Sequence, residues 1–152
     1  RRELQEGGYL RPDTDRKRMK QAKLPPMRFE STDGYPIYVG QNNRQNDELT
    51  FRLARKDDIW CHASKVHGSH VIISCGGTTP PDDTVTQAAQ LAAYYAETGG
   101  GQNIPVDVTA VKQVKKIPNG KPGMVIYHTY RTVIANPYPD IVVDALNAET
   151  KE

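Results

Sequence analysis

The sequence has only two cysteines, a single tryptophan and no long hydrophobic run. Cys61 and Cys75 lack the CxxC spacing of a redox pair and are too few for a disulfide scaffold, so we expect two reduced, buried thiols. No apolar stretch approaches membrane-spanning length, and the opening residues Arg1, Arg2 and Glu3 do not have the pattern of a signal peptide. From these absences we expect a cytoplasmic fragment of a longer protein that does not interact with a membrane.

The length of 152 residues suits one domain with a hydrophobic core. Because 37% of the residues are apolar and 25% are charged, we expect some segments to lie outside that core. We predict the end of an upstream helical region and a basic flexible linker in residues 1–26. An ordered domain is predicted for residues 27–139, and a C-terminal extension for residues 140–152.

The charges are unevenly distributed along the chain. The net charge is only +2, but residues 1–23 and residues 111–131 are rich in Lys and Arg, whereas residues 66–111 contain neither. A polyanion responds to clustered charge and not to the total. The two basic blocks are therefore compatible with binding to a polyanion such as a nucleic acid.

Several short runs have the alternation or β-branched composition of strands. A hairpin is predicted across Thr32, Asp33 and Gly34, and the Asn-rich residues 40–48 predict a polar loop. Val71, Ile72 and Ile73 suit a strand that is buried on both faces. The predicted strands are residues 27–31, 35–39, 49–53, 59–63, 71–73, 106–114 and 124–130, with 131–135 extending or following the last and 141–143 a final candidate.

One main helix is predicted after residue 79. Thr79, followed by Pro80, Pro81 and two acidic residues, is typical of a helix start with a capping hydroxyl. Small residues recur at helical spacing as far as Ala96, and Gly99 to Gly101 end the pattern. One helix among strands joined by hairpins predicts an α+β fold, with a largely antiparallel sheet and one main helix packed on it.

The densest motif surrounds the tryptophan. On a strand, Trp60 and His62 point to one face while Cys61 points to the other. A Trp beside a His can stack on a base or ribose. Alternatively, Trp60 is a core residue and His62 bonds a nearby carbonyl, which the spacing alone favours. Ser69 and His70 follow closely and join the same candidate set.

The same residue types raise two catalytic alternatives. Cys61, His62, His67 and His70 are zinc-ligand types, but adjacent strand positions point apart, which disfavours one shared ion. A hydrolase triad on Ser69 and His70 lacks the GxSxG nucleophile elbow. We therefore expect no metal, no cofactor and no catalytic activity, and keep a metal-dependent enzyme as the least favoured alternative.

Lysines and aromatic residues gather in the predicted hairpin near the C-terminal end. Their summed field would attract phosphates, and the aromatics could stack on bases. An edge hairpin kept soluble by lysines is an equally good interpretation of the spacing. The residues concerned are Lys112, Lys115, Lys116, Lys121, Tyr127, His128, Tyr130 and Arg131.

A third candidate is the amide-rich stretch around Asn42, Asn43 and Asn46. Amide side chains on a loop can read base edges or bind sugar and phosphate. The physically simpler alternative is that they satisfy their own backbone, as asparagines in turns do.

Taken together, these motifs resemble the C-terminal domain of the NFACT family, called NFACT-R. The resemblance covers residues 27–135 in order and departs from the usual pattern at His67, where the family has Pro. It rests on Ser31-Thr32-Asp33-Gly34, Ile37-Tyr38-Val39-Gly40-Gln41-Asn42-Asn43, Gln45-Asn46-Asp47, Asp58-Ile59-Trp60-Cys61-His62, Gly68-Ser69-His70-Val71, residues 88–95, residues 111–116 and Gly120-Lys121-Pro122-Gly123-Met124-Val125-Ile126-Tyr127.

The resemblance implies an RNA-binding domain of a factor in ribosome-associated quality control. Family members bind large ribosomal subunits that carry a stalled peptidyl-tRNA, and recruit alanyl-tRNA in bacteria to extend the nascent chain. The implied partners are tRNA and the large ribosomal subunit, and fibronectin for an adhesion module as the alternative. We expect RNA contacts from Lys112, Lys115, Lys116, Lys121, Arg131, Asn42, Asn43 and Asn46. Trp60, His62, Ser69 and His70 are expected to form either an RNA-contacting face or the structural centre that shapes it.

Overall fold

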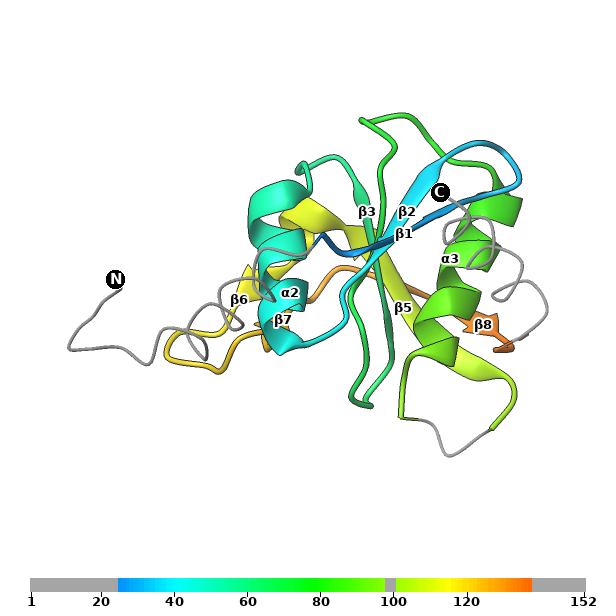
Figure 1. Cartoon of the computed structure of the whole chain (residues 1–152). Coiled ribbons are helices and arrows are strands. Elements are labelled where there is room, and N and C mark those ends of the chain that lie inside the picture. Colours follow the sequence, from blue (N-terminus) through cyan, green and yellow to red (C-terminus); the bar gives the residue numbers. More distant parts are fainter. Residues whose placement is uncertain (1–24, 98–100, 138–152) are drawn as a thin grey trace, which may run out of the picture.

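The computed structural model describes residues 25–97 and 101–137 (Figure 1). The helical region and linker predicted before residue 25, the glycines at 99 and 100, and the strand predicted at residues 141–143 lie outside the described residues. The described part has the predicted α+β fold, with a largely antiparallel sheet.

The main sheet of the described residues has six strands in the order β1-β2-β4-β3-β5-β8, and every neighbouring pair is antiparallel. A separate small sheet joins two short strands between β5 and β8. The strands are β1 (Met27–Glu30), β2 (Pro36–Val39), β3 (Ile59–Ala63), β4 (Val71–Ile73), β5 (Ile104–Ala110), β6 (Lys115–Lys116), β7 (Val125–Ile126) and β8 (Arg131–Ala135).

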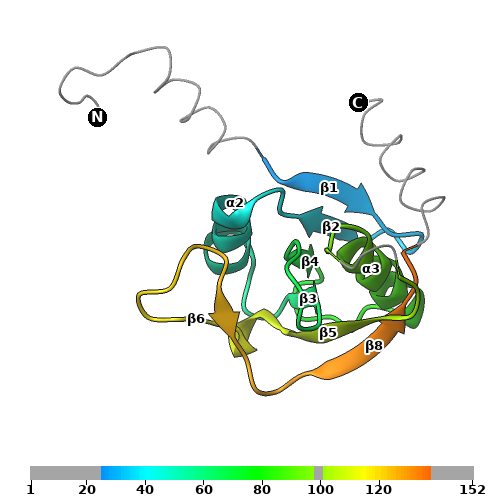
Figure 2. The ribbon, with the colours of Figure 1, turned by 90° about the horizontal axis from the view of Figure 1, so that it is seen from below.

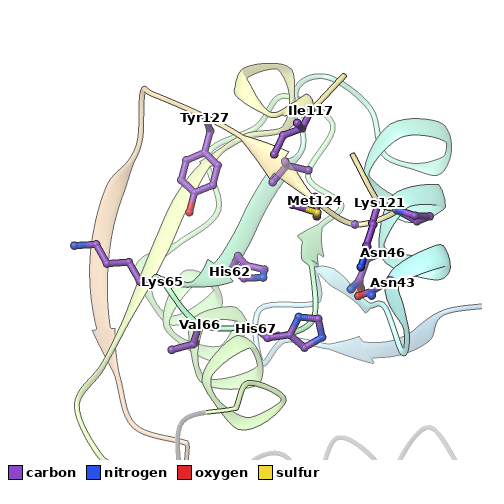
Figure 3. Close-up of a pocket in the computed structure, with 14 residues that line it drawn as sticks. Asn43, Asn46, His62, Lys65, Val66, His67, Ile117, Lys121, Met124 and Tyr127 are labelled. Atoms are coloured by element: carbon purple, nitrogen blue, oxygen red, sulfur yellow. The ribbon is translucent and has the colours of Figure 1, made fainter. Parts of the chain in front are cut away.

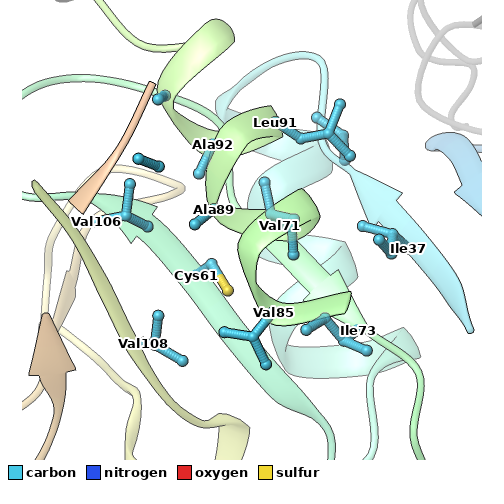
Figure 4. Close-up of a cluster of buried hydrophobic side chains, with 14 of the residues drawn as sticks. Ile37, Cys61, Val71, Ile73, Val85, Ala89, Leu91, Ala92, Val106 and Val108 are labelled. Atoms are coloured by element: carbon cyan, nitrogen blue, oxygen red, sulfur yellow. The ribbon is translucent and has the colours of Figure 1, made fainter. Parts of the chain in front are cut away.

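Helix α3 (Asp82–Tyr94) covers one face of the main sheet (Figures 1 and 4). Its small buried residues, such as Ala88 and Ala92, pack against Cys61 and Val71 of the sheet. Short side chains let the helix backbone approach the strands closely, which excludes water from a continuous apolar layer. This layer forms the larger of the two hydrophobic clusters among the described residues.

The predicted helix is present, but both of its predicted ends are wrong. Extended Pro81 is the residue before the first turn and no side chain caps it, so Thr79 is not the cap. The acidic Asp82 and Asp83 in the first turn complement the positive end of the helix dipole instead. The helix ends at Tyr94, before the glycines that were expected to end it.

Helix α2 (Asn43–Glu48), the wide helical turn η1 (Leu49–Leu53) and the β6–β7 hairpin cover the opposite face of the sheet. Figures 1 and 2 show α3 on one side of the strands and α2 with β6 on the other. The second hydrophobic cluster lies beneath this layer and contains Leu49, Trp60, Ile72, Val111 and Val114. The sheet is therefore covered on both faces, which agrees with the two-sided burial predicted for residues 71–73, although the second covering layer itself was not predicted.

Two predictions in this region are wrong. Residues 43–48 are a helix and not part of a polar loop, because Asn42 accepts the backbone N–H of Gln45 at 2.8 Å and so caps it. Residues 49–53 continue in helical geometry and are not a strand, since Leu49 is buried while Leu53 is 58% exposed. A five-residue alternating run fits either period.

The predicted strands at residues 106–114 and 124–130 are both shorter than expected. β5 ends at Ala110, because residues 111–113 form a 3-10 turn in which the backbone N–H of Val114 donates to the carbonyl of Val111 at 2.9 Å. β7 is only Val125–Ile126. Of the two alternatives predicted for residues 131–135, the structure has the second: they follow β7 as the separate strand β8, which pairs with β5, with Arg131 opposite Val108.

Candidate nucleic-acid interface

Strand β3 places its residues on the two faces as predicted. Cys61 packs in the cluster under α3, whereas Trp60 belongs to the cluster on the other face. Burial raises the pKa of the Cys61 thiol to about 12, which keeps it protonated and inert. Within residues 25–97 and 101–137, no three His, Cys, Asp or Glu side chains come close enough to hold a metal ion.

Trp60 is a core residue. Its side chain is 0% exposed, so it offers no ring face to a ligand. The indole Nε1–H donates to Nδ1 of His70 at 3.2 Å, and the ring of Tyr127 packs against the indole at 4.8 Å between centroids. Trp60 therefore holds His70 and Tyr127, which lie between it and the molecular surface, in place.

His70 connects four segments of the chain. Its Nδ1 accepts from Trp60 and from the hydroxyl of Thr50 at 2.7 Å, so its proton lies on Nε2 and is donated to the carbonyl of Gly123 at 3.1 Å. Its backbone N–H donates to Oδ1 of Asn46 at 3.1 Å. Burial lowers the pKa of the imidazole to about 3, so the ring is neutral.

The three candidate asparagines have different surroundings. Asn42 caps α2, and Asn43 is exposed on its first turn. Asn46 is only 4% exposed, and a Cβ atom added to Gly40 would overlap its side-chain oxygen. Gly40 therefore allows α2 to approach β2, and Asn43 is the asparagine of the helix that faces outward.

Asp47 holds both arms of the β6–β7 hairpin. Its Oδ2 accepts from Nζ of Lys116 at 2.9 Å, and its Oδ1 accepts from the backbone N–H of Gly123 at 3.4 Å. The Lys116 ammonium also lies 5.7 Å from the centroid of the Phe51 ring. Lys116 therefore anchors the hairpin, and its charge is already partnered.

Exposed lysines surround a groove of about 390 Å³ between residues 50–56 and residues 111–116, which we call the lysine groove. Lys112 and Lys115, two members of the predicted basic set, line this groove. The backbone N–H of Lys112 donates to the carbonyl of Lys56 at 3.1 Å, which connects the two sides of the groove. Lys56 was missed, although the basic run with Arg52 and Arg55 gave a signal. No Asp or Glu occurs among the described residues that line the groove.

A second concavity of about 500 Å³ lies between residues 121–125 and the turn at residues 65–68 (Figure 3), and we call it the hairpin cleft. Lys121 lines this cleft and not the lysine groove, together with Asn43, His62, Lys65 and His67. The structure therefore divides the predicted basic set between two neighbouring sites.

His62 lies at the cleft with part of its ring exposed. The ring stacks on Trp60, with centroids 5.5 Å apart and planes inclined by 5°. Its Nδ1–H donates to the carbonyl of Ala63 at 2.7 Å. This agrees with the alternative prediction that His62 bonds a nearby carbonyl. Burial lowers the pKa of the imidazole, so the neutral ring is favoured.

Tyr127 closes the hairpin onto the main sheet. Its hydroxyl donates to Oδ2 of the buried Asp107 at 2.6 Å, and Thr132 donates to Oδ1 at 3.2 Å. Burial and the bond to Asp107 raise the pKa of the Tyr127 hydroxyl. Asp107 was missed because a single Asp within a strand gives no recognisable pattern.

Two other predicted residues lie apart from these sites. Arg131 pairs across the strands with Val108, which faces α3, so its side chain starts from the face opposite His62. Its charge lies near Cys61 on that face. Ser69 is half-buried next to His70.

A match to a known protein family identifies the domain that carries the groove and the cleft. Residues 26–129 match the NFACT protein RNA binding domain. The chain belongs to this family. It is 44% identical over 146 residues to the Rqc2 homolog RqcH of Bacillus subtilis, covering 94% of this chain and 25% of that protein. Identity to the Rqc2 homolog RqcH of Streptococcus pneumoniae is 42% over 138 residues, covering 90% and 24%.

A solved structure also matches this NFACT domain. It is the C-terminal part of the fibronectin/fibrinogen-binding protein from Streptococcus suis, with a TM-score of 0.77 and 40% identity over 81% of this chain and 49% of that one. The NFACT chain spans about a quarter of the curated relatives it matches. No helix in the described ranges is long and apolar enough to cross a membrane.

Proposed function

We propose that this chain is a non-catalytic RNA-binding domain whose lysine groove holds RNA phosphates. The observation that carries the proposal is the meeting of exposed Lys56, Lys112 and Lys115 from two separate segments. Each phosphate that such a lysine neutralises releases counterions, so the groove gains affinity for any RNA backbone. Half-buried Phe51 adds an apolar surface beside these charges.

The parent protein is proposed to be an RqcH-type factor of ribosome-associated quality control in the bacterial cytoplasm. In that role it binds stalled large ribosomal subunits and supports alanyl-tRNA-dependent C-terminal tailing of nascent chains. The names of the relatives support the factor type, and the family description supports the RNA. The RNA held in the groove is then tRNA or ribosomal RNA.

The proposed contacts differ from residue to residue. Lys56, Lys112 and Lys115 contact phosphates directly, while Lys121 and Asn43 contact RNA at the neighbouring hairpin cleft. Trp60 and His70 are buried and hold these side chains in place without touching RNA. Asn46 and Lys116 border the cleft and the groove and are held there by bonds to His70 and Asp47. Arg131, on the opposite face of the sheet, is outside the proposed contact surface.

The test is a salt titration of RNA binding followed by fluorescence anisotropy. Replacing Lys56, Lys112 and Lys115 by Gln should weaken binding to tRNA and to an unrelated duplex RNA to a similar degree. The slope of log affinity against log salt should fall by about 0.7 to 0.9 for each phosphate that a lysine no longer neutralises. Arg131→Gln removes a charge from the other face and is the control, for which we expect an unchanged slope.

An unchanged salt slope in the triple variant would overturn the phosphate assignment. Absence of binding to any RNA by the unchanged chain would overturn the proposed function of the isolated domain. Circular dichroism of each variant checks that the fold is retained, which we expect because the three lysines are exposed.

Fibronectin binding is a second candidate, favoured by the name of the structural relative from Streptococcus suis. It is tested with the same chain on immobilised fibronectin at physiological salt. Saturable binding to fibronectin by a chain that binds no RNA would favour the adhesion role. The reverse pattern would favour the RNA-binding role.

A further inference from the structure

We propose that the hairpin cleft binds a single unpaired nucleotide of the RNA whose backbone lies in the lysine groove. This inference rests on the proposed function and adds a preference for single-stranded segments. The cleft and the groove are both formed by the hairpin segment of residues 111–125, so one RNA strand can reach both. The chemistry, the size and the rigidity of the cleft each support this ligand.

The polar lining of the cleft suits a nucleotide. Exposed Lys65 and Lys121 provide positive charge, and no Asp or Glu occurs among the described lining residues. Figure 3 shows Lys121 and Asn43 on the side of α2, and Lys65 on the opposite side of His62. A phosphate can therefore pair with a lysine at the rim while the Asn43 amide faces the edge of a base.

The apolar lining suits the flat faces of a base. Val66, Ile117, Pro122 and Met124 line the cleft, and Met124 is 47% exposed. The imidazoles of His62 and His67 add surfaces on which bases stack. Lysines alone would attract any polyanion, whereas apolar walls beside them favour an aromatic ring attached to a phosphate.

The size of the cleft limits what enters it. Its volume of about 500 Å³ lies in the lower half of the range for small-ligand sites, which is roughly 300 to 1,000 Å³. One nucleotide fits such a space. A base within a duplex is paired along one edge and stacked on both faces, so only an unpaired nucleotide offers its base to the cleft walls.

Several hydrogen bonds fix the cleft in advance of any ligand. The carbonyl of Gly123 accepts from His70, and its amide donates to Asp47. Tyr127, on the same segment, is tied to Asp107. These bonds hold the loop at residues 121–125 against the sheet, so binding costs little ordering of the wall.

The test compares two RNA probes with the same stem, one blunt and one carrying a short single-stranded overhang. The unchanged 152-residue chain should bind the overhang probe about tenfold more tightly, because stacking of a base contributes on that order. Met124→Glu adds an acid inside the cleft and should reduce this ratio to about one, since the acid repels the phosphate.

Ile126→Glu is the matched control. Ile126 is 44% exposed on the same hairpin and pairs across the strands with Lys115, away from the cleft lining. An acid there can weaken binding of both probes through Lys115, but it should leave the ratio between them unchanged. Thermal unfolding followed by circular dichroism compares the folds of the two variants.

The outcomes separate this proposal from the proposed function. Equal binding of both probes by the unchanged chain, with a steep salt slope, would overturn the cleft proposal and leave the groove proposal standing. A ratio that survives Met124→Glu would also overturn it. If neither probe binds, the proposed function fails and the cleft proposal fails with it.

A competition experiment distinguishes an RNA strand from a free nucleotide as the source of the ligand. Single-stranded oligonucleotide should displace the overhang probe, whereas free adenosine monophosphate at the same nucleotide concentration should not. Displacement by both at equal concentration would overturn the RNA-strand proposal, because the cleft would then bind a free nucleotide without help from the groove.

Discussion

The imidazole of His70 donates its Nε2 proton to the carbonyl of Gly123, 53 residues further along the chain. This bond ties the loop of the β6–β7 hairpin to the start of β4. Because His70 also accepts from Trp60 on β3, the hairpin is connected directly to the centre of the main sheet. One buried neutral histidine thus helps to fix the position of the cleft.

Replacing His70 by Ala should destabilise the fold by about 3 kcal/mol. The change leaves a cavity and removes the partners of the Trp60 indole N–H and the Thr50 hydroxyl, both in the interior. Urea unfolding measures the difference. His67→Ala is the control, and its exposed side chain should cost less than about 0.5 kcal/mol. Equal stability of the two variants would contradict the role given to His70.

Stability should fall as the pH is lowered below 6.5, the ordinary pKa of His70, toward its folded-state pKa of about 3. Because burial lowers the folded-state pKa, the unfolded chain takes up the proton first. The stabilisation is therefore complete above pH 6.5 and decreases by about 1.4 kcal/mol per pH unit within this window. Neighbouring His62 lowers the pKa of His70 further, while Asp47 opposes the shift.

Urea unfolding of the unchanged chain and of His70→Gln at about pH 7 and about pH 5 measures this dependence. The glutamine cannot titrate, so the variant should show a shallower decrease. The remaining slope comes from the other titrating groups, including His62, whose pKa burial also lowers. Parallel slopes for the two proteins would show that His70 is not protonated differently in the folded chain.

Gly123→Ala should cost more stability than Gly34→Ala. Both glycines have left-handed backbones, with φ of 86° and 88°, which an Ala adopts at a cost of about 1 to 2 kcal/mol. A Cβ atom at Gly34 meets nothing within 4 Å, whereas one at Gly123 lies 3.2 Å from the carbonyl oxygen of Asn43. The difference in unfolding free energy therefore measures the close approach of the hairpin to α2, and equal costs would contradict that contact.

Tyr127→Phe should destabilise the chain by about 2 kcal/mol, because the buried Asp107 carboxylate then keeps Thr132 but loses a charge-assisted bond. Tyr130→Phe removes a hydroxyl from a residue that is 48% exposed, so it should be nearly neutral. Thermal unfolding of the two variants provides the comparison. A neutral Tyr127→Phe would show that the bond to Asp107 does not hold the hairpin.

The local pattern predicted the sheet well where one face is clearly apolar. Alternation on β3 gave the correct faces for Trp60 and Cys61, and the β-branched run of β4 is buried as expected. The pattern failed at residues 49–53, where alternation over five residues does not separate a strand from a helical turn. The cap formed by Asn42 was available from residue type, but its side chain also suits a loop.

The site was harder to predict than the fold, because its arrangement depends on distant partners. Lys115 and Lys116 are adjacent, yet of the two only Lys116 forms an ion pair among the described residues, with an Asp 69 residues away. Arg131 seemed to continue the lysine hairpin, but the pairing of β8 with β5 carries it to the other face. Residue type identified the basic set, and only the strand order divided it between the groove and the cleft.

β5 and β8 are direct neighbours in the sheet, yet residues 111–130 intervene between them and form one side of both proposed RNA sites. Because doubling a flexible connection costs only about 0.6 kcal/mol of chain entropy, such an excursion can change in length with little effect on strand pairing. The scaffold and the ligand-facing segment are thus separable in engineering terms. A sequence grafted between Ala110 and Arg131 has to keep the residues that dock this segment to the rest of the domain. These are buried Val111 and Val114, Lys116 on Asp47, Gly123 on His70 and Tyr127 on Asp107.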